Sequence, residues 1–161
     1  MEMKHLDVVV VGAGISRIGA AYNLQKTCPQ KSFTILEGRE NIGGTWDLFK
    51  YPGIRSDSDM HTMGFRFKPW TDPKTIADGP SIIRYLKEAV EENNLEEKIQ
   101  FRKKVISASW NTNDALWTLE IENKLNNTTE FMSCNILYLC GGYYNYDEGY
   151  TPEFKGWDDF E

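Results

Sequence analysis

Two short apolar runs that end near glycine predict strands of a parallel sheet, and the first of them predicts a strand buried on both faces. Residues 7–11 are mostly valine and stop at Gly12, and residues 136–139 are apolar and lie just before Gly141 and Gly142. Continuous apolar runs of this length are typical of the central strands of a parallel sheet. We therefore expect both segments to lie in one parallel sheet.

The segment that follows the first glycines changes to a helical period. Apolar residues recur at spacings of three and four over residues 15–26, and Pro29 lies beyond the end. Residues 32–37 then predict a second strand. Because crossovers between strands of one sheet are right-handed, the second strand is expected to run parallel to the first. Residues 7–37 therefore predict a βαβ unit.

The rest of the chain predicts one more helix and a meander. Residues 38–78 have no sustained period, and so long an irregular segment in a compact domain is usually functional, so we expect ligand contacts there. A helix is predicted from Pro80 to about Asn93, with Asp78 or Gly79 as its cap. Strands at 99–110, 115–123 and 129–134, separated by Asn-rich turns, predict an antiparallel meander. The predicted fold class is α/β, a Rossmann-like fold of the glutathione-reductase-like type with a parallel central sheet and a three-stranded meander.

Composition narrows the function classes. The 161 residues fit one domain, and a net charge of −6 with a pI near 5.0 disfavours nucleic acid as a partner. The apolar runs are too short to cross a bilayer, and residues 1–6 lack the apolar stretch of a signal peptide, so we expect a cytoplasmic protein. Three widely spaced cysteines predict buried, reduced thiols.

The first strand–helix junction carries the strongest chemical signal. Gly12 permits a tight turn, Gly14 lets backbone approach a diphosphate, and the helix N-terminus offers unpaired N–H groups to the anion. Glu37 ends the second strand, where an acid accepts hydrogen bonds from a ribose without a 2′-phosphate. The pattern predicts a dinucleotide site, whereas the structural alternative is a tight turn beside a surface glutamate.

Position 17 departs from this fingerprint. The pattern G-x-G-x-x-G places its third glycine there to allow close packing of helix and strand, and this chain has Arg17. Burying a guanidinium without a partner costs roughly several kcal/mol of folding free energy, so Arg17 must reach solvent, an acid or the phosphates. Our hypothesis is that Arg17 weakens cofactor binding.

Several runs resemble the class B flavoprotein monooxygenases, most closely the Baeyer–Villiger enzymes of the ethionamide-activating type. These runs are GGTWD at 43–47, YPGIRSDSDM at 51–60, IADG at 76–79, KVISA at 104–108 and GYYNYDEGY at 142–150. The resemblance implies an FAD site, with NADPH as reductant of the full-length protein, and a ketone or a sulfur or nitrogen compound as the small-molecule substrate. It implies nothing about oligomeric state.

The resemblance also implies roles for individual residues. Val105 is expected to reach the adenine through its backbone. The full set of expected diphosphate, ribose, flavin and adenine contacts is Gly12, Gly14, Ile15, Ser16, Glu37, Gly44, Thr45, Trp46, Asp57, Val105 and Gly141. Of these, Asp57 is also the expected active-site carboxylate, which in the family helps to position an arginine from a later part of the chain. Asp57 and Asp59 lack the further ligands of a metal loop, so no metal site is predicted. For Trp46 and Trp70 core packing is the alternative, and it is the role we favour for Trp110 and Trp117.

The resemblance predicts that the chain is the N-terminal part of an FAD-binding domain, residues 1–161, without the NADPH domain or the closing part of the FAD domain. We expect no oxygenase activity from these residues alone. Two alternatives stay open: a heteroatom-oxidising flavin monooxygenase, and a non-catalytic remnant that binds FAD weakly. A disulfide reductase is disfavoured because residues 40–50 contain no cysteine pair.

Overall fold

A strand buried on both faces stands at the centre of the sheet, as expected. In the computed structural model, which describes residues 3–142, 144 and 148–159, β1 (Lys4–Val11) pairs in parallel with β2 (Phe33–Leu36) and with β6 (Thr128–Leu139). Val8 and Val10 pack into one hydrophobic cluster, and Val9 packs into a second cluster on the opposite face. The apolar run therefore has the two-sided burial that it predicted.

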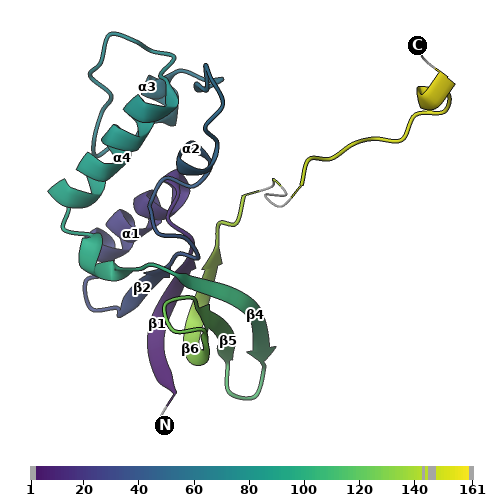
Figure 1. Cartoon of the computed structure of the whole chain (residues 1–161). Helices are drawn as coiled ribbons and strands as arrows, with labels where there is room; N and C mark the ends of the chain where they lie inside the picture. Colours follow the sequence, from purple (N-terminus) through teal and green to yellow (C-terminus); the bar gives the residue numbers. More distant parts are fainter. Residues whose placement is uncertain (1–2, 143, 145–147, 160–161) are drawn as a thin grey trace.

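The predicted meander is part of the same sheet. The six strands described have the order β3-β2-β1-β6-β5-β4, in which β3 (Ile99–Gln100) is parallel to β2 and β5 (Leu116–Asn123) is antiparallel to both β6 and β4 (Lys103–Asn111). In Figure 1, β6 lies beside β1, and β5 and β4 continue the sheet beyond β6. The predicted α/β class, with parallel and antiparallel parts, is confirmed.

Two strand boundaries were wrong. The segment predicted as one strand at 99–110 is divided into β3 and β4, because Arg102 has a positive φ of 58° that ends the extended backbone. The segments predicted as separate strands at 129–134 and 136–139 form the single long strand β6. Residues 128–134 of β6 pair with β5 along one edge and residues 132–139 pair with β1 along the other, so β6 joins the meander to the parallel strands.

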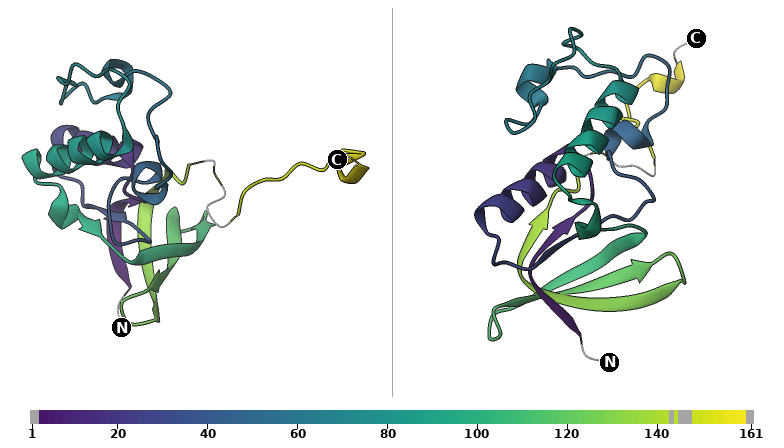
Figure 2. Two further views of the ribbon diagram at one scale, coloured as in Figure 1. Left: turned by 45° about the horizontal axis from the view of Figure 1, so that its top comes forward. Right: turned by 90° about the vertical axis from the view of Figure 1, so that its left-hand side faces the viewer.

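Two helices cover one face of the parallel strands. Both views of Figure 2 put α1 (Ile15–Thr27) and α4 (Gly79–Glu92) on the same side of β1 and β2. Asp78 caps α4 by accepting a 2.9 Å hydrogen bond from the Ser81 amide, and Pro80 lies in the first turn. The buried side chains of α4 include Ile82, Tyr85, Leu86, Ala89 and Val90.

The irregular segment is held against these helices by aromatic rings. It contains two one-turn helices, α2 (Thr45–Leu48) and α3 (Met60–Met63), that the sequence did not predict. Tyr22 of α1 stacks on Phe67 with ring centroids 3.7 Å apart, and Phe67 stacks on Phe65 at 4.7 Å. The Tyr85 hydroxyl accepts from the Phe65 amide and donates to the Lys68 carbonyl, both at 2.6 Å. These contacts fix the position of the loop that carries the candidate ligand residues.

On the face of the sheet that α1 and α4 cover, the side chains of β6 remain exposed. Ile136 and Tyr138 lie beside Val8 and Val10 in the parallel register and so point to the helix side, yet Ile136 is 57% exposed and Tyr138 is 48% exposed. Trp117 packs against the second cluster as expected, but Trp110 is 46% exposed, so core packing of Trp110 was wrong. It lies near the free end of the meander, where its ring contacts Trp117 at 5.5 Å.

The remaining described elements are the short 3₁₀ helices η1 (Glu96–Lys98) and η2 (Trp157–Asp159). None of the helices within the described residues has the length and apolar character needed to cross a bilayer. Cys28, Cys134 and Cys140 are free thiols, of which Cys134 is fully buried. Part of the 142–150 run that resembles the monooxygenases lies outside the described residues.

Candidate functional site

The glycine turn after β1 is tied to the end of β2. Gly12 has φ +97°, a conformation that side chains disfavour, and its amide donates to the Leu36 carbonyl at 2.5 Å. The next amide, that of Ala13, donates to Glu37 Oε2 at 2.7 Å. The turn and the acid that the sequence paired therefore lie in direct contact.

Glu37 is a buried acid at the rim of a cavity. Only 6% of its surface is exposed, and its second oxygen accepts from the Arg39 amide at 2.9 Å. A carboxylate oxygen can accept more than one hydrogen bond, so both oxygens of Glu37 keep capacity for a hydroxyl donor. The alternative of a surface glutamate beside a tight turn is excluded by this burial.

The second arm of the site is the glycine pair before α2. Gly43 has φ +119° and its amide donates to the Ala13 carbonyl at 2.8 Å. A Cβ on Gly44, which has φ +56°, would lie 3.2 Å from the Cα of Gly14. Backbone therefore meets backbone at this point, and glycine at both positions keeps the two arms close together.

Arg39 joins the two arms and was not predicted. Its Nη2 donates to the Gly44 carbonyl at 2.9 Å, and its guanidinium lies 3.7 Å from Glu37 and 3.5 Å from Asp47. The available signal was a cation two residues after the acid that ends β2, which is too common a spacing to single out.

Two cavities follow the carboxyl ends of the parallel strands, the edge where open α/β sheets bind ligands. The first cavity, of about 550 Å³, is lined by Gly12, Arg17, Glu37, Gly38, Arg39, Gly44, Leu48, Lys104, Lys124, Gly141 and Tyr144. The second cavity, of about 320 Å³, is lined by Gly14, Ile15, Ser16, Arg17, Gly43, Gly44, Thr45, Trp46, Asp57, Ser58, Met63, Cys140, Gly142 and Tyr144.

Ten of the eleven residues expected to contact the cofactor line one of these cavities. The exception is Val105, whose side chain packs against the second hydrophobic cluster while the neighbouring Lys104 lines the first cavity. Asp57 is exposed, and it lines the second cavity with Trp46. The irregular segment therefore supplies cavity walls on both sides of the glycine turn.

Arg17 lies across the glycine turn. Its Nε donates to the Val11 carbonyl at 2.8 Å, so the half-buried guanidinium finds a backbone acceptor. A Cβ on Gly12 would overlap this guanidinium, and a Cβ on Gly14 would lie 2.9 Å from its Nη1. The glycine backbone thus makes the space that a diphosphate needs, and the end of a long, flexible side chain occupies it.

Other titratable groups near the cavities have structural roles. Burial raises the pKa of the Cys140 thiol and outweighs the positive charge of Arg17, which acts in the opposite direction. The raised pKa keeps the sulfur protonated. Hydrogen bonds from Thr62 lower the pKa of Asp59, which caps α3. No cluster of three or more metal-ligating side chains occurs among the described residues.

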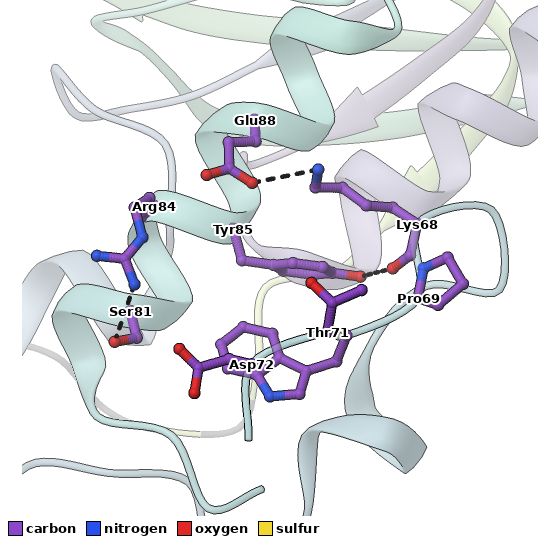
Figure 3. Close-up of a pocket in the computed structure, with 9 residues that line it drawn as sticks. Lys68, Pro69, Thr71, Asp72, Ser81, Arg84, Tyr85 and Glu88 are labelled. Atoms are coloured by element: carbon purple, nitrogen blue, oxygen red, sulfur yellow. Dashed lines mark hydrogen bonds and ion pairs between the residues drawn. The ribbon is translucent and has the colours of Figure 1, made fainter. Parts of the chain in front are cut away.

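A smaller cavity of about 210 Å³ lies away from the strand ends, between α4 and the loop at 68–72. Figure 3 shows that its polar groups contact one another: Lys68 Nζ lies 3.2 Å from Glu88, and the Tyr85 hydroxyl donates to the Lys68 carbonyl. These side chains hold the loop to the helix. No glycine is among the residues that line this cavity, in contrast to the two cavities at the strand ends.

The turn, helix and strand-ending acid have the arrangement of a Rossmann-like domain. Residues 10–73 match the family model described as an NAD(P)-binding Rossmann-like domain. This match covers the end of β1, α1, β2 and the second glycine arm, which supply most of the residues that line the two cavities.

Within that class, the resemblance to the FAD-containing monooxygenases is confirmed. The chain is 55% identical over 157 residues to the FAD-containing monooxygenase EthA of Mycobacterium tuberculosis, and 51% identical over 158 residues to the probable FAD-binding monooxygenase AlmA of Acinetobacter baylyi. Each comparison covers 98% of this chain and 32% of the relative. The chain thus spans about a third of the length of these relatives.

Solved structures give the same relationship. A steroid monooxygenase bound to NADP superimposes with a TM-score of 0.80 at 26% identity, covering 97% of this chain and 29% of that one. A cyclohexanone monooxygenase with cyclohexanone bound superimposes with a TM-score of 0.78 at 25% identity, covering 89% and 28%. In sequence this chain is similar to FAD-containing monooxygenases, and in fold it is similar to Baeyer–Villiger monooxygenases.

Proposed function

We propose that residues 1–161 form the N-terminal part of the FAD-binding domain of an NADPH-dependent flavin monooxygenase. The whole protein would insert one oxygen atom from O₂ into a ketone, or oxidise a soft heteroatom. The observation that carries this proposal is the contact between the glycine turn and the buried Glu37, at the carboxyl ends of β1 and β2. The relatives, which are named as an FAD-containing monooxygenase and a probable FAD-binding monooxygenase, support it.

The backbone of the site fits a dinucleotide. Side chains on Gly12, Gly14 or Gly44 would fill the space between the two arms, and the amides that open α1 are available to an anion. We assign the diphosphate to Gly12, Gly14, Ile15 and Ser16, and the adenosine ribose to Glu37. Gly44, Thr45 and Trp46 would flank the flavin, with Val105 and Gly141 on the adenine side.

A bound FAD would supply the redox chemistry, taking a hydride from NADPH and activating O₂. The chain's own residues would bind and orient it: Trp46 offers an apolar wall, and Asp57 in the same cavity is the proposed positioning carboxylate. The NADPH site is proposed for the whole protein only. Residues 1–161 alone should produce no lactone or ester from a ketone, FAD and NADPH.

Titration of the purified chain with FAD tests the proposal directly. We expect saturable quenching of flavin fluorescence, and a loss of about tenfold in affinity for Glu37→Gln, because the carboxylate acceptor of the ribose hydroxyls is removed. Glu40→Gln is the matched control, since Glu40 is exposed and its one ion pair within the described residues is with Arg102. Equal FAD affinity in the parent and Glu37→Gln would contradict the assignment.

We also propose a cytoplasmic location and a small-molecule substrate without a nucleic acid partner. The acidic charge balance of −6 supports the absence of a nucleic acid partner, because binding to nucleic acid depends on Lys and Arg that neutralise phosphates.

A further inference from the structure

Arg17 separates the two cavities of the groove. It lines both of them, and its guanidinium lies against Gly12 in the first cavity and against Gly14 in the second. A dinucleotide that runs from one cavity to the other must cross this point. The guanidinium must therefore leave the Val11 carbonyl before such a ligand fits.

The first cavity is strongly basic within an acidic chain. Four cations line it, Arg17, Arg39, Lys104 and Lys124, against the single acid Glu37. Arg39 is paired with Glu37 and Asp47, whereas no acid in the described part of the chain forms an ion pair with the other three. Lys104 and Lys124 are exposed at the rim. This charge pattern suits a ligand with several negative charges at one end.

We propose that Arg17 turns the adenosine half of the groove into a site for a free nucleoside diphosphate, in preference to FAD. The ribose would bind Glu37, as in the proposed function on which this inference rests, and the terminal phosphate would pair with the Arg17 guanidinium. The terminal phosphate of a nucleoside diphosphate ends at the guanidinium. It carries more negative charge than the phosphodiester group that FAD would place there. FAD, by contrast, must displace the guanidinium to reach Trp46.

Isothermal titration of the parent chain with ADP and with FAD tests the proposal. We expect the parent to bind ADP at least about tenfold more tightly than FAD, because a guanidinium–phosphate pair is a charge-assisted hydrogen bond. In Arg17→Ala we expect about a tenfold gain for FAD and about a tenfold loss for ADP, so that the order of the two ligands reverses. Arg66→Ala, at an exposed arginine outside both cavities, is the control and should change neither affinity.

Arg17→Met separates bulk from charge and guards against a folding defect in the alanine variant. It keeps a long side chain over the glycines and removes the cation, so it should lose ADP affinity without gaining FAD affinity. Circular dichroism should show the parent melting curve for each variant. FAD binding that is equally tight in the parent and Arg17→Ala would overturn this inference alone. Absence of binding of FAD and ADP to every folded variant would overturn the proposed function as well.

Discussion

The parallel strands β1 and β6 lie side by side and both end near glycine, yet their ends differ. At the end of β1, Gly12 is tied to β2, and the Arg17 guanidinium covers it. At the end of β6, a Cβ on Gly141 would meet no atom within 4 Å among the described residues. The first end also lies under α1 and α4, whereas Ile136 and Tyr138 of β6 are exposed.

This difference shows that glycine alone does not leave a site open. At β1 the backbone conformation requires glycine and makes room for a ligand, and a side chain five residues later takes that room. At β6 the same residue type meets no such neighbour. The space beside the glycine turn of β1 is therefore set by one side chain outside the turn itself.

The largest expected difference in stability is between a methyl group added at the end of β1 and one added at the end of β6. Gly12→Ala should lower the free energy of unfolding by about 2 kcal/mol, because φ +97° strains any side chain and the new Cβ overlaps Arg17. Gly141→Ala should change it by less than about 0.5 kcal/mol. Urea unfolding of both variants measures this, and equal costs would remove the contrast between the two strand ends.

The next effect concerns the tie between the glycine turn and β2. Glu37→Gln should lower the free energy of unfolding by about 1.5 kcal/mol, since an amide has one acceptor oxygen for the two backbone donors, Ala13 and Arg39. Glu40→Gln loses only an exposed ion pair and should cost less than about 1 kcal/mol. Thermal melts of the two variants compare them, and a smaller shift for Glu37→Gln would show that the turn is held by other contacts.

The covered side of the sheet also depends on the cap of α4. Asp78→Ala should lower the free energy of unfolding by about 1 kcal/mol through loss of the hydrogen bond to the Ser81 amide. Hydrogen bonds from Lys74 and Ser81 hold the pKa of Asp78 below its usual value. The carboxylate's contribution is therefore complete above the unfolded-state pKa of about 4 and is lost as the pH falls below it. Between pH 7 and pH 3, the melting temperature should fall less in Asp78→Asn than in the parent.

The smallest effect is expected on the bare face of β6. Ile136→Thr should change the free energy of unfolding by less than about 0.5 kcal/mol, because the side chain is already 57% exposed. Val8→Thr, at the register partner buried in the cluster with α1, should cost about 2 kcal/mol. A similar cost for both substitutions, measured in urea, would mean that β6 is covered in solution.

The sequence predicted the parts of the fold that rest on local patterns. The valine run of β1, the period of α1 and the Asp78-Pro80 start of α4 each depend on neighbours close in the chain, and their elements appeared where expected. The continuous strand β6 depends on pairing with β1, which is far away in sequence, as well as with β5, and its full length was missed. Local patterns therefore fixed the elements, and long-range pairing fixed how the sheet joins them.

The site shows the same division. The pairing of the glycine turn with Glu37 was predicted because a βαβ unit places them together. The orientation of Arg17 over the glycines was not predicted, because four rotatable bonds separate its guanidinium from the backbone and the Val11 carbonyl selects among many conformers. The roles of Arg39 and Lys104 likewise depend on where distant loops meet.

A crystal structure of Arg17→Ala with FAD would show whether the glycine turn and Glu37 hold a dinucleotide. We expect the diphosphate over Gly12 and Gly14, facing the amides that open α1, with the adenosine ribose within hydrogen-bond distance of Glu37. Electron density for FAD in another place, such as the cavity between α4 and the loop at 68–72, would contradict this expectation.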